Sequence, residues 1–267
     1  MKFFIVGLGS MGKRRIRNLH ANGEKDIVGF DIRADRNAEA KEKYGIRTLA
    51  RLADISPKEF EALIISTSPD AHGDYIRYAL KHKKHFFVEH PTSDDGYKEI
   101  FKNKDATVKA PSCTFLFNPA VKMMKKVLHE GAIGKVLAFQ YHMGQYLPDW
   151  HPFEDYRMVY FSKKKTGACR EMFAFELIWL NALFGSRVKK ATGSITKLSD
   201  LDMDAEDTVT AFVKYENGVR GTLLIDVIAR KPFRTLRVLG SEGVLEWERF
   251  EYAIKIFTAK DKKTRTL

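Results

Sequence analysis

Short runs of apolar residues alternate with longer helical stretches in the first part of the chain. The apolar runs have the length of buried strands and lie at residues 2–6, 27–31, 46–48, 62–67 and 86–89, with a sixth expected within 107–117. Between them, residues 13–22, 35–44 and 71–82 have the composition of helices. Strands that alternate with helices are typical of a doubly wound parallel sheet. We therefore predict an α/β domain over residues 1–117.

The remainder of the chain, residues 118–267, follows a different pattern. Helices are predicted at 119–130 and 169–184, and a long strand at 136–146. Further β-rich segments lie at 189–196, 208–215, 218–228, 235–239, 243–248 and 252–257. The turn Glu216-Asn217-Gly218 carries a strong hairpin signal. These patterns predict an α+β domain with a largely antiparallel open sheet and helices on one face.

The first strand runs directly into Gly7-Leu8-Gly9-Ser10-Met11-Gly12, and a helical stretch follows. In this context G-x-G-x-x-G is the fingerprint of a Rossmann dinucleotide site, although glycines alone also mark ordinary turns. Gly7 permits the tight turn, Gly9 lets the backbone approach a pyrophosphate, and Gly12 allows the helix to pack closely on the strand. Ser10 and Met11 open the helix, whose free N–H groups and dipole favour phosphate.

Asp31 ends the second predicted strand, nineteen residues after Gly12. A carboxylate at this position can accept hydrogen bonds from both ribose hydroxyls of an adenosine. It would repel a 2′-phosphate, although Arg33 and Arg36 lie close enough in sequence to offset that repulsion. Of these two arginines, Arg33 is the expected cofactor residue. We therefore expect NAD as the cofactor, with NADP possible.

Ligands of doubly wound folds bind at the carboxyl ends of the strands. The segments expected at this edge are Gly7–Gly12, Asp31, Ser66–His72 and Glu89-His90-Pro91. Ser66, Thr67, Pro69 and His72 are expected beside the nicotinamide ribose, with Glu89 on the same ribose. For the serine and threonine the alternative is a turn and helix cap, and His72 could equally be a packing histidine.

Composition narrows the class of protein. The net charge is +12, but the basic clusters are spread along the chain, which is typical of solvated faces rather than of a nucleic-acid site. Apolar runs stay well short of the ~20 residues that span a bilayer, and the first one precedes its basic residues, the reverse of a secretory signal. Cys113 and Cys169 have no metal-binding spacing. We expect a cytoplasmic protein with no nucleic-acid or membrane partner.

Several motifs, in this order, resemble the Gfo/Idh/MocA oxidoreductases, the family of glucose–fructose oxidoreductase and inositol dehydrogenase. They are GLGSMG at 7–12, STSPDAH at 66–72, EHP at 89–91, FLFNPA at 115–120, GAIGKV at 131–136 and GACREMFAFELIWLNALFG at 167–185. The resemblance implies a Rossmann domain followed by an α/β domain whose open sheet often builds an interface, hence a homodimer or homotetramer. It also implies hydride transfer between NAD(P) and a hydroxyl-bearing carbon of a sugar, cyclitol or nucleotide sugar.

The departures from the family pattern concern the proton-transfer residues. The lysine of the family's E-K-P is replaced by His90, and its D-x-x-x-H pair falls on Glu171 and Phe175, so the usual catalytic histidine is missing. An imidazole titrates near ~6.5 and can serve as base or acid around neutrality. We therefore expect His90 and Glu171 to be catalytic. The alternative for His90 is a histidine hydrogen-bonded at a strand end.

Glu176 lies beside the missing histidine, and Arg170 adjoins Glu171. A buried carboxylate among the neighbouring apolar residues would need a partner. It could contact substrate hydroxyls, or it could pair with an arginine for structure. Both Arg170 and Glu176 are kept as candidate substrate residues.

The segment 147–165, LPDWHPFEDYRMVYFSKKK, is rich in aromatic and charged residues. The family's equivalent loop overhangs the substrate, so Trp150, His151, Tyr156 and Arg157 are candidate substrate residues, with the aromatics stacking on a sugar and Arg157 holding an anion. The alternative is a purely structural loop. The acids and histidine here have no dependable metal spacing, and no metal is expected. The loop resembles that of a subgroup associated with bacterial surface polysaccharides, which favours an anionic or nucleotide-linked sugar.

The sequence therefore predicts an NAD(P)-dependent oxidoreductase acting on a sugar or nucleotide-sugar derivative. The alternative is a nucleotide-binding family member without redox activity, with a sensor or assembly role. The replacements at His90 and Phe175 are the reason for keeping that alternative.

Overall fold

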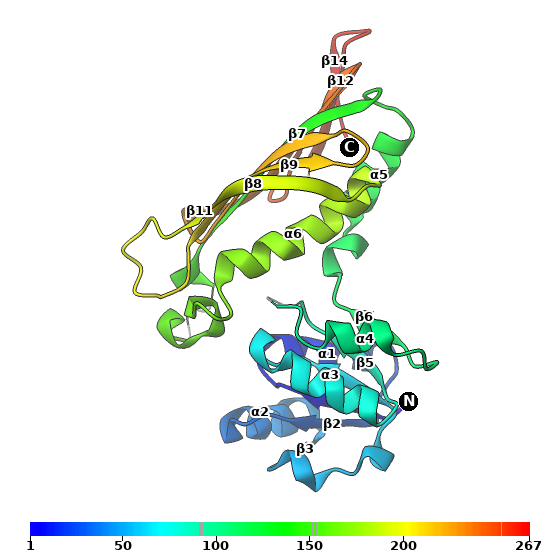
Figure 1. Ribbon diagram of the computed structural model, residues 1–267, viewed down its shortest axis with the longest axis vertical. Coiled ribbons are helices and arrows are strands. Elements are labelled where there is room, and N and C mark those ends of the chain that lie inside the picture. The colour runs from blue at the N-terminus through cyan, green and yellow to red at the C-terminus, as the bar shows by residue number, and fades with distance from the viewer. Residues whose placement is uncertain (91–92, 151, 153, 252) are drawn as a thin grey trace. The chain divides into compact units, whose positions relative to one another are not determined.

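The computed structural model describes the chain except for residues 91–92, 151, 153 and 252 (Figure 1). The chain forms two compact units, Met1–Ser112 and Cys113–Leu267. The division between the compact units follows Ser112, whereas the sequence pattern places the domain boundary after residue 117. The short 3₁₀ turn η4, Thr114–Phe117, belongs to the second unit because its Phe115 packs into that unit's core.

A six-stranded parallel sheet forms the centre of the first unit, in the order β3-β2-β1-β4-β5-β6. Its strands are β1 Phe3–Val6, β2 Ile27–Phe30, β3 Arg47–Leu49, β4 Ala62–Ile65, β5 His85–Val88 and β6 Lys109–Pro111. This order is that of the dinucleotide-binding Rossmann fold, in which the strand sequence reverses between β1 and β4. The predicted doubly wound sheet is confirmed.

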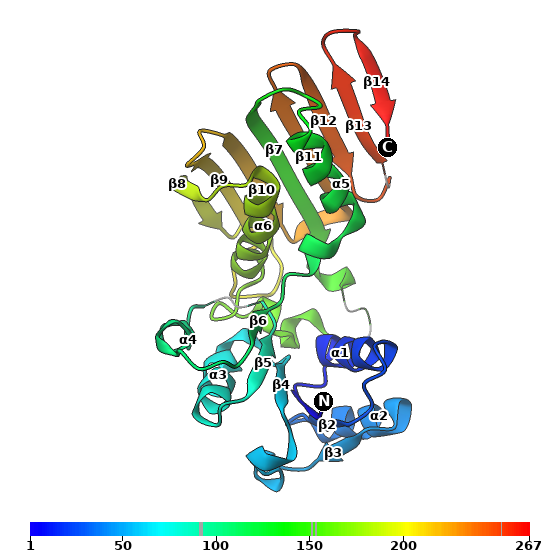
Figure 2. The same ribbon diagram turned by 90° about the vertical axis from the view of Figure 1, so that its right-hand side faces the viewer.

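Helices cover both faces of this sheet, with α1 Ser10–Ala21 and α2 Ala34–Tyr44 on one side of the strands and α3 His72–Lys81 and α4 Tyr97–Lys102 on the other (Figure 2). One apolar cluster joins the sheet to α1 and α2, with Ile5 and Ile64 meeting Ile16 and Ala40. A second cluster lies on the opposite face and joins Ile65 and Val88 to the side of α3 that carries Ile76. Alternate strand residues thus serve alternate faces.

The second unit is built on one eight-stranded sheet in the order β14-β13-β12-β11-β7-β10-β9-β8, and Figure 2 shows its strands side by side. The strands are β7 Val136–Tyr146, β8 Val188–Thr196, β9 Thr208–Tyr215, β10 Arg220–Asp226, β11 Ile228–Gly240, β12 Gly243–Glu248, β13 Ala253–Thr258 and β14 Lys263–Thr266. All neighbours are antiparallel except β7 and β10, which pair in parallel. The predicted largely antiparallel sheet is confirmed.

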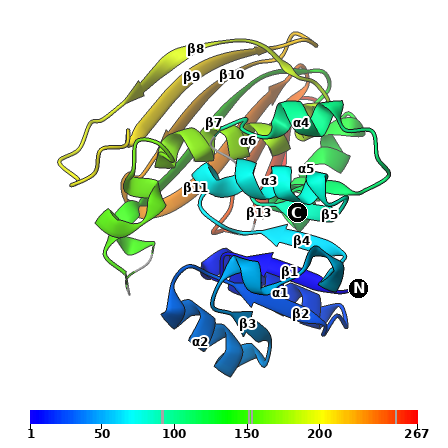
Figure 3. The same cartoon turned by 60° about the horizontal axis from the view of Figure 1, so that its bottom comes forward.

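Two helices, α5 Pro119–His129 and α6 Ala168–Phe184, lie on the same face of this sheet (Figure 2). Strands β8, β9 and β10 arch over α6 in Figure 3. The core between them is aromatic: Trp179 of α6 packs edge-on against Tyr141 of β7 and Trp247 of β12, at centroid distances of 5.5 and 5.9 Å. The other face of the sheet carries no helix among the described residues.

The helix ends follow from local sequence. The side chain of Asn118 accepts the backbone N–H of Ala120 at 2.9 Å and caps α5, and Pro119 occupies the first turn, where it sacrifices no hydrogen bond. Helix α6 ends at Gly185, whose positive φ of 59° suits a left-handed C-cap. Two elements were not expected from the sequence, α4 and β14, because both are short and largely polar.

Candidate functional site

The glycine loop makes two backbone contacts that exclude any side chain. Gly7 has a φ of +85°, and a Cβ there would lie 2.4 Å from the carbonyl oxygen of Ser66, at the end of β4. A Cβ on Gly12 would lie 1.8 Å from the carbonyl oxygen of Gly7. Both distances are far below van der Waals contact, so only glycine allows α1 to start this close to β1 and β4. The expected roles of Gly7 and Gly12 match this geometry.

Helix α1 begins with an uncapped turn. Gly9 is its N-cap and provides no side-chain hydrogen bond, and the first turn contains no acidic residue. A Cβ on Gly9 would meet only the end of the Arg36 side chain, at 3.3 Å. The N–H groups of the first turn, including those of Ser10 and Met11, are therefore available to an anion such as a phosphate.

Asp31 is buried beside the glycine loop, immediately after β2. Its Oδ2 accepts the N–H of Leu8 at 2.7 Å and its Oδ1 accepts the N–H of Arg33 at 2.9 Å. The side chain of Asn37 holds the backbone of Asp31 through bonds of 2.9 and 2.7 Å. The sequence analysis did not identify Asn37. This residue lies six positions after Asp31 and fixes the backbone of Asp31 through these two bonds.

The two arginines near Asp31 differ in position. Arg33 pairs with Asp35 at 2.6 Å on the exposed surface, whereas Arg36 approaches Oδ2 of Asp31 at 3.7 Å. Arg36 is therefore the cation placed beside the acid and the glycine loop, although Arg33 was the expected cofactor residue.

The loop after β4 has three buried polar atoms with no hydrogen-bond partner among the described residues: Ser66 Oγ, Thr67 Oγ1 and His72 Nδ1. The other ring nitrogen of His72, Nε2, lies 3.1 Å from the carbonyl oxygen of Thr67. Since a carbonyl can only accept, Nε2 carries the hydrogen and Nδ1 is an acceptor. Burial lowers the pKa of His72 and keeps the ring neutral. Such unsatisfied groups fit a polar ligand at this loop.

Glu89 follows β5 and is paired with Arg15 of α1, a residue that the sequence analysis placed among solvated charges. Arg15 Nε lies 2.5 Å from Oε1 of Glu89, and Nη2 lies 2.8 Å from Oε2. His90 comes next and is partly buried, and the following residues 91–92 lie outside the described part of the chain. Pro69 is buried at the start of the turn that leads into α3.

These contacts bring the expected cofactor residues of the first unit to one edge of its sheet. Gly7 meets Ser66, Leu8 meets Asp31, and α1 reaches Glu89 through Arg15. The edge is the carboxyl end of the parallel strands, where doubly wound folds bind their ligands.

In the second unit, Glu171 lies in the first turn of α6. The hydroxyl of Tyr160 donates to its Oε1 at 3.4 Å. Tyr160 stacks on Phe161, and Phe161 meets the ring of Trp150 edge-on at 4.5 Å. Trp150 Nε1 is buried and has no partner among the described residues. An aromatic cluster thus adjoins the glutamate.

The arginines of this region are paired with acids. Arg157 contacts Asp155 at 2.6 Å and Asp202 at 3.6 Å, and Arg170 contacts Glu206 at 2.5 Å. The hydroxyl of Tyr156 accepts the N–H of Asp202 at 3.0 Å. His151, also a candidate substrate residue, lies outside the described residues.

Glu176 is a core residue, which contradicts its expected substrate role. It is fully buried, and its oxygens accept from the Tyr141 hydroxyl at 2.6 Å, Trp179 Nε1 at 2.5 Å and Arg234 Nη2 at 2.7 Å. Of the two alternatives for this carboxylate, pairing with an arginine is the one found. Burial, together with the neighbouring Glu176 carboxylate, raises the pKa of Tyr141 far above its usual value, so the phenol stays a donor.

Phe175, which the resemblance placed at the family's histidine position, packs edge-on against Phe115, at 5.7 Å between centroids. The guanidinium carbon of Arg234 lies over the Phe115 ring, 4.3 Å from its centroid. Phe175 is therefore part of the aromatic packing next to the Glu176–Arg234 pair.

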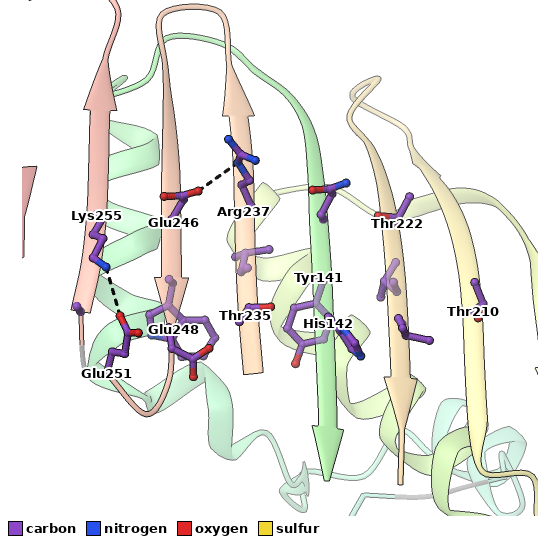
Figure 4. Close-up of a pocket in the computed structure, with 16 residues that line it drawn as sticks. Tyr141, His142, Thr210, Thr222, Thr235, Arg237, Glu246, Glu248, Glu251 and Lys255 are labelled. Atoms are coloured by element: carbon purple, nitrogen blue, oxygen red, sulfur yellow. Dashed lines mark hydrogen bonds and ion pairs between the residues drawn. The ribbon is translucent and has the colours of Figure 1, made fainter. Parts of the chain in front are cut away.

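The uncovered face of the second sheet is hollowed into a groove of about 530 Å³ (Figure 4). Its lining is polar, with Thr210, Thr222, Thr235 and Gln140 beside charged residues. Two ion pairs cross it, Arg237–Glu246 at 3.2 Å and Lys255–Glu251 at 3.3 Å. None of the predicted site residues lines this groove.

Among the described residues, no helix combines the length and the apolar character of a membrane span. No group of three or more His, Cys, Asp and Glu side chains among them is placed to hold a metal ion.

Two family models match the chain. The model described as an oxidoreductase family with an NAD-binding Rossmann fold matches residues 1–116, and the one described as the GFO/IDH/MocA C-terminal domain matches residues 121–246. Myo-inositol 2-dehydrogenase of Thermotoga maritima is 24% identical over 257 residues, which cover 91% of this chain and 74% of that enzyme. The chain spans between 58% and 74% of the length of the first curated relatives that it matches.

Solved structures with the same fold include two dehydrogenases. Levoglucosan dehydrogenase in complex with NADH has a TM-score of 0.86 and 19% identity, and the match covers 100% of this chain and 79% of that one. WlbA dehydrogenase of Bordetella pertussis, in complex with NADH and UDP-GlcNAcA, has a TM-score of 0.81 and 18% identity, with 93% and 79% covered.

Replacing Gly12 by alanine should lower both stability and NADH affinity, because the new Cβ must displace the Gly7 carbonyl. We expect a loss of about 1–3 kcal/mol in the unfolding free energy and NADH binding weakened by at least about tenfold. Calorimetric titration and thermal unfolding measure the two effects. Gly9→Ala is the matched control: it meets only a flexible side chain, so it should weaken NADH binding while leaving the melting temperature nearly unchanged. Equal melting temperatures for both variants would contradict the close contact.

Replacing Arg234 by methionine should destabilise the second unit by about 3–5 kcal/mol, because Glu176 is then a buried charge without its counter-charge. The double variant Glu176→Gln/Arg234→Met should lose less unfolding free energy, because it leaves no buried charge unpaired. All three tryptophans lie in the second unit, so their fluorescence during urea unfolding reports on that unit alone. If the double variant lost as much as Arg234→Met, the pair would not be the cause.

Proposed function

The chain belongs to the Gfo/Idh/MocA oxidoreductases, an NAD-binding Rossmann family, and we propose that it transfers a hydride between NAD and a hydroxyl-bearing carbon of a sugar derivative. The observation that carries the proposal is the edge of the first sheet, where a bare helix N-terminus, a buried acid and three unsatisfied polar atoms converge. The comparisons add that similar proteins are dehydrogenases of inositol and levoglucosan.

The residues at this edge fit the parts of a dinucleotide. Gly7 to Gly12, with Ser10 and Met11, would hold the pyrophosphate on backbone N–H groups. Asp31, held by Leu8 and Asn37, would accept hydrogen bonds from the adenosine ribose hydroxyls. Arg36 beside it leaves NADP possible, since its charge would offset the repulsion between Asp31 and a 2′-phosphate.

The loop after β4 and the acid after β5 would hold the nicotinamide end. Buried polar atoms of Ser66, Thr67 and His72 could form hydrogen bonds with this end of the cofactor. Pro69 begins the turn that connects them. Glu89 would accept hydrogen bonds from the adjacent ribose. When bound, the nicotinamide supplies the hydride acceptor or donor of the reaction.

The proton of the substrate hydroxyl needs its own acceptor. We assign it to His90, the residue after Glu89, because an imidazole can both accept and donate a proton. Glu171 is the second proposed catalytic group. Its carboxylate lies next to the Tyr160 hydroxyl and could accept a hydrogen bond from a substrate hydroxyl.

The proposed substrate is a neutral sugar ring or the neutral ring of a nucleotide sugar. Trp150 and its cluster offer flat apolar faces and one unsatisfied indole N–H. Arg157 and Arg170 are paired with acids, so an anionic group would have to compete with those carboxylates. This argues against an anionic sugar, which was one of the two substrate types that the loop sequence favoured.

We also propose a cytoplasmic homodimer or homotetramer, associated through the uncovered face of the second sheet. Its groove carries arginine and lysine together with glutamates, a charge pattern that a second copy related by twofold symmetry could complement. The two cysteines are both free, as suits a reducing compartment.

His90→Ala should reduce turnover by at least ~10²-fold, the lower end for general acid–base catalysis, with NADH affinity changed by no more than about twofold. Turnover is followed as NADH absorbance with a panel of neutral sugars, cyclitols and nucleotide sugars. His20→Ala, on the exposed side of α1, is the control. Unchanged turnover in His90→Ala would remove this histidine from the mechanism, and NADH binding without turnover on any sugar would favour a non-redox role.

Asp31→Asn should shift the preference between NADH and NADPH by about tenfold toward NADPH, a change of about 1.4 kcal/mol. The amide keeps an oxygen for the N–H of Leu8 but no longer repels a 2′-phosphate. Titration of both cofactors gives the ratio of dissociation constants, and Arg36→Gln should move that ratio in the opposite direction. An unchanged ratio in both variants would place the adenosine ribose elsewhere.

A further inference from the structure

Arg15 joins the glycine-loop helix to the residue that precedes His90. It lies three residues after Gly12, in the first part of α1. Its Nε and Nη2 meet the two oxygens of Glu89 at 2.5 and 2.8 Å, a two-bond pairing of guanidinium and carboxylate. Both side chains are mostly buried, with 13% and 12% of their surface exposed.

Two further contacts hold the guanidinium. Nη2 also donates to the hydroxyl of Ser112 at 3.2 Å, and Ser112 follows β6. The guanidinium carbon lies 4.6 Å from the ring centroid of Phe87, on β5. Arg15 thus connects α1 with the ends of two strands, and Glu89 is held in one orientation.

This pairing leaves Glu89 able to bind a ligand. A carboxylate has about four acceptor positions, and Arg15 uses one on each oxygen. The remaining positions suit two donors side by side, such as the 2′- and 3′-hydroxyls of a ribose. A bidentate guanidinium orients the carboxylate plane in a way that a lysine cannot.

We propose that Arg15 is a positioning residue for cofactor binding. It orients Glu89 so that the free acceptor positions meet the ribose next to the nicotinamide, and it thereby aligns His90 with the reactive ring. The proposal rests on the proposed function, since it needs a dinucleotide at this edge.

The test compares NADH with ADP, which lacks the nicotinamide and its ribose. Both ligands are titrated by calorimetry against the full chain and its Arg15→Gln, Arg15→Lys, Glu89→Gln and Arg15→Gln/Glu89→Gln variants. Arg15→Gln should weaken NADH about tenfold, the effect of losing one charge-assisted hydrogen bond, and leave ADP within about twofold. The NADH affinity of Arg15→Lys should lie between those of the unmodified chain and Arg15→Gln, because lysine keeps the charge but not the two-bond geometry.

The double variant separates positioning from any independent role of Arg15. If Arg15 acts through Glu89, the double variant should bind NADH no more weakly than Glu89→Gln alone. Arg14→Gln is the matched control, since Arg14 is the exposed neighbour on the same helix and the charge change is identical. It should leave NADH affinity within about twofold, and thermal unfolding confirms that each variant is folded.

Three results would overturn the proposal: unchanged NADH affinity in Arg15→Gln, an equal loss for ADP and NADH, or additive losses in the double variant. If Arg15→Gln does not fold, Arg15→Lys and Glu89→Gln give the same comparison of NADH with ADP. A chain that binds neither ligand would refute the proposed function itself. A chain that binds both, with Arg15→Gln unaffected, would refute the positioning role alone.

Discussion

The close approach of Gly12 to the carbonyl of Gly7 is the contact on which the first unit depends. It lets α1 start directly against the strand ends, and the start of α1 in turn positions Leu8, whose N–H holds Asp31. The same helix carries Arg15 to Glu89. A side chain at Gly12 would push the helix outward and loosen all three connections at once. The residues at the carboxyl end of the first sheet are therefore structurally coupled, because all three connections depend on where α1 begins.

The core of the second unit contains a buried ion pair, Glu176–Arg234, whose side chains contact other core residues. Glu176 receives donors from a phenol, an indole and a guanidinium, so a charged group is buried without being left unsatisfied. Phe175 fills the neighbouring position with aromatic packing. With Glu176 and Phe175 both taken up by core packing, the proposed proton transfer is assigned to His90 and Glu171.

Local patterns in the sequence predicted the two folds well, because strand runs, the glycine loop and helix caps are short-range signals. Contacts between residues far apart in the sequence could not be predicted. Arg15 looked like one of several solvated cations, and only the fold brings it to Glu89, which is 74 positions away. Glu176 could have faced substrate or arginine, since its helix did not reveal which side meets Arg234. The parallel pairing of β7 with β10 was likewise hidden, because periodicity does not specify a neighbour.

That parallel pairing affects the order in which the chain can assemble. Strand β7 ends at Tyr146, but both strands that flank it come after residue 219. During synthesis at ~5–20 residues per second, β7 therefore waits on the order of several seconds with both edges open. Long-range closure of this kind is slow and exposes unpaired backbone. The centre of the sheet can thus close only after β11 has been synthesised, and β12 to β14 then add outward from β11. Until that point β7 is an unpaired strand open to chaperones and to misassembly.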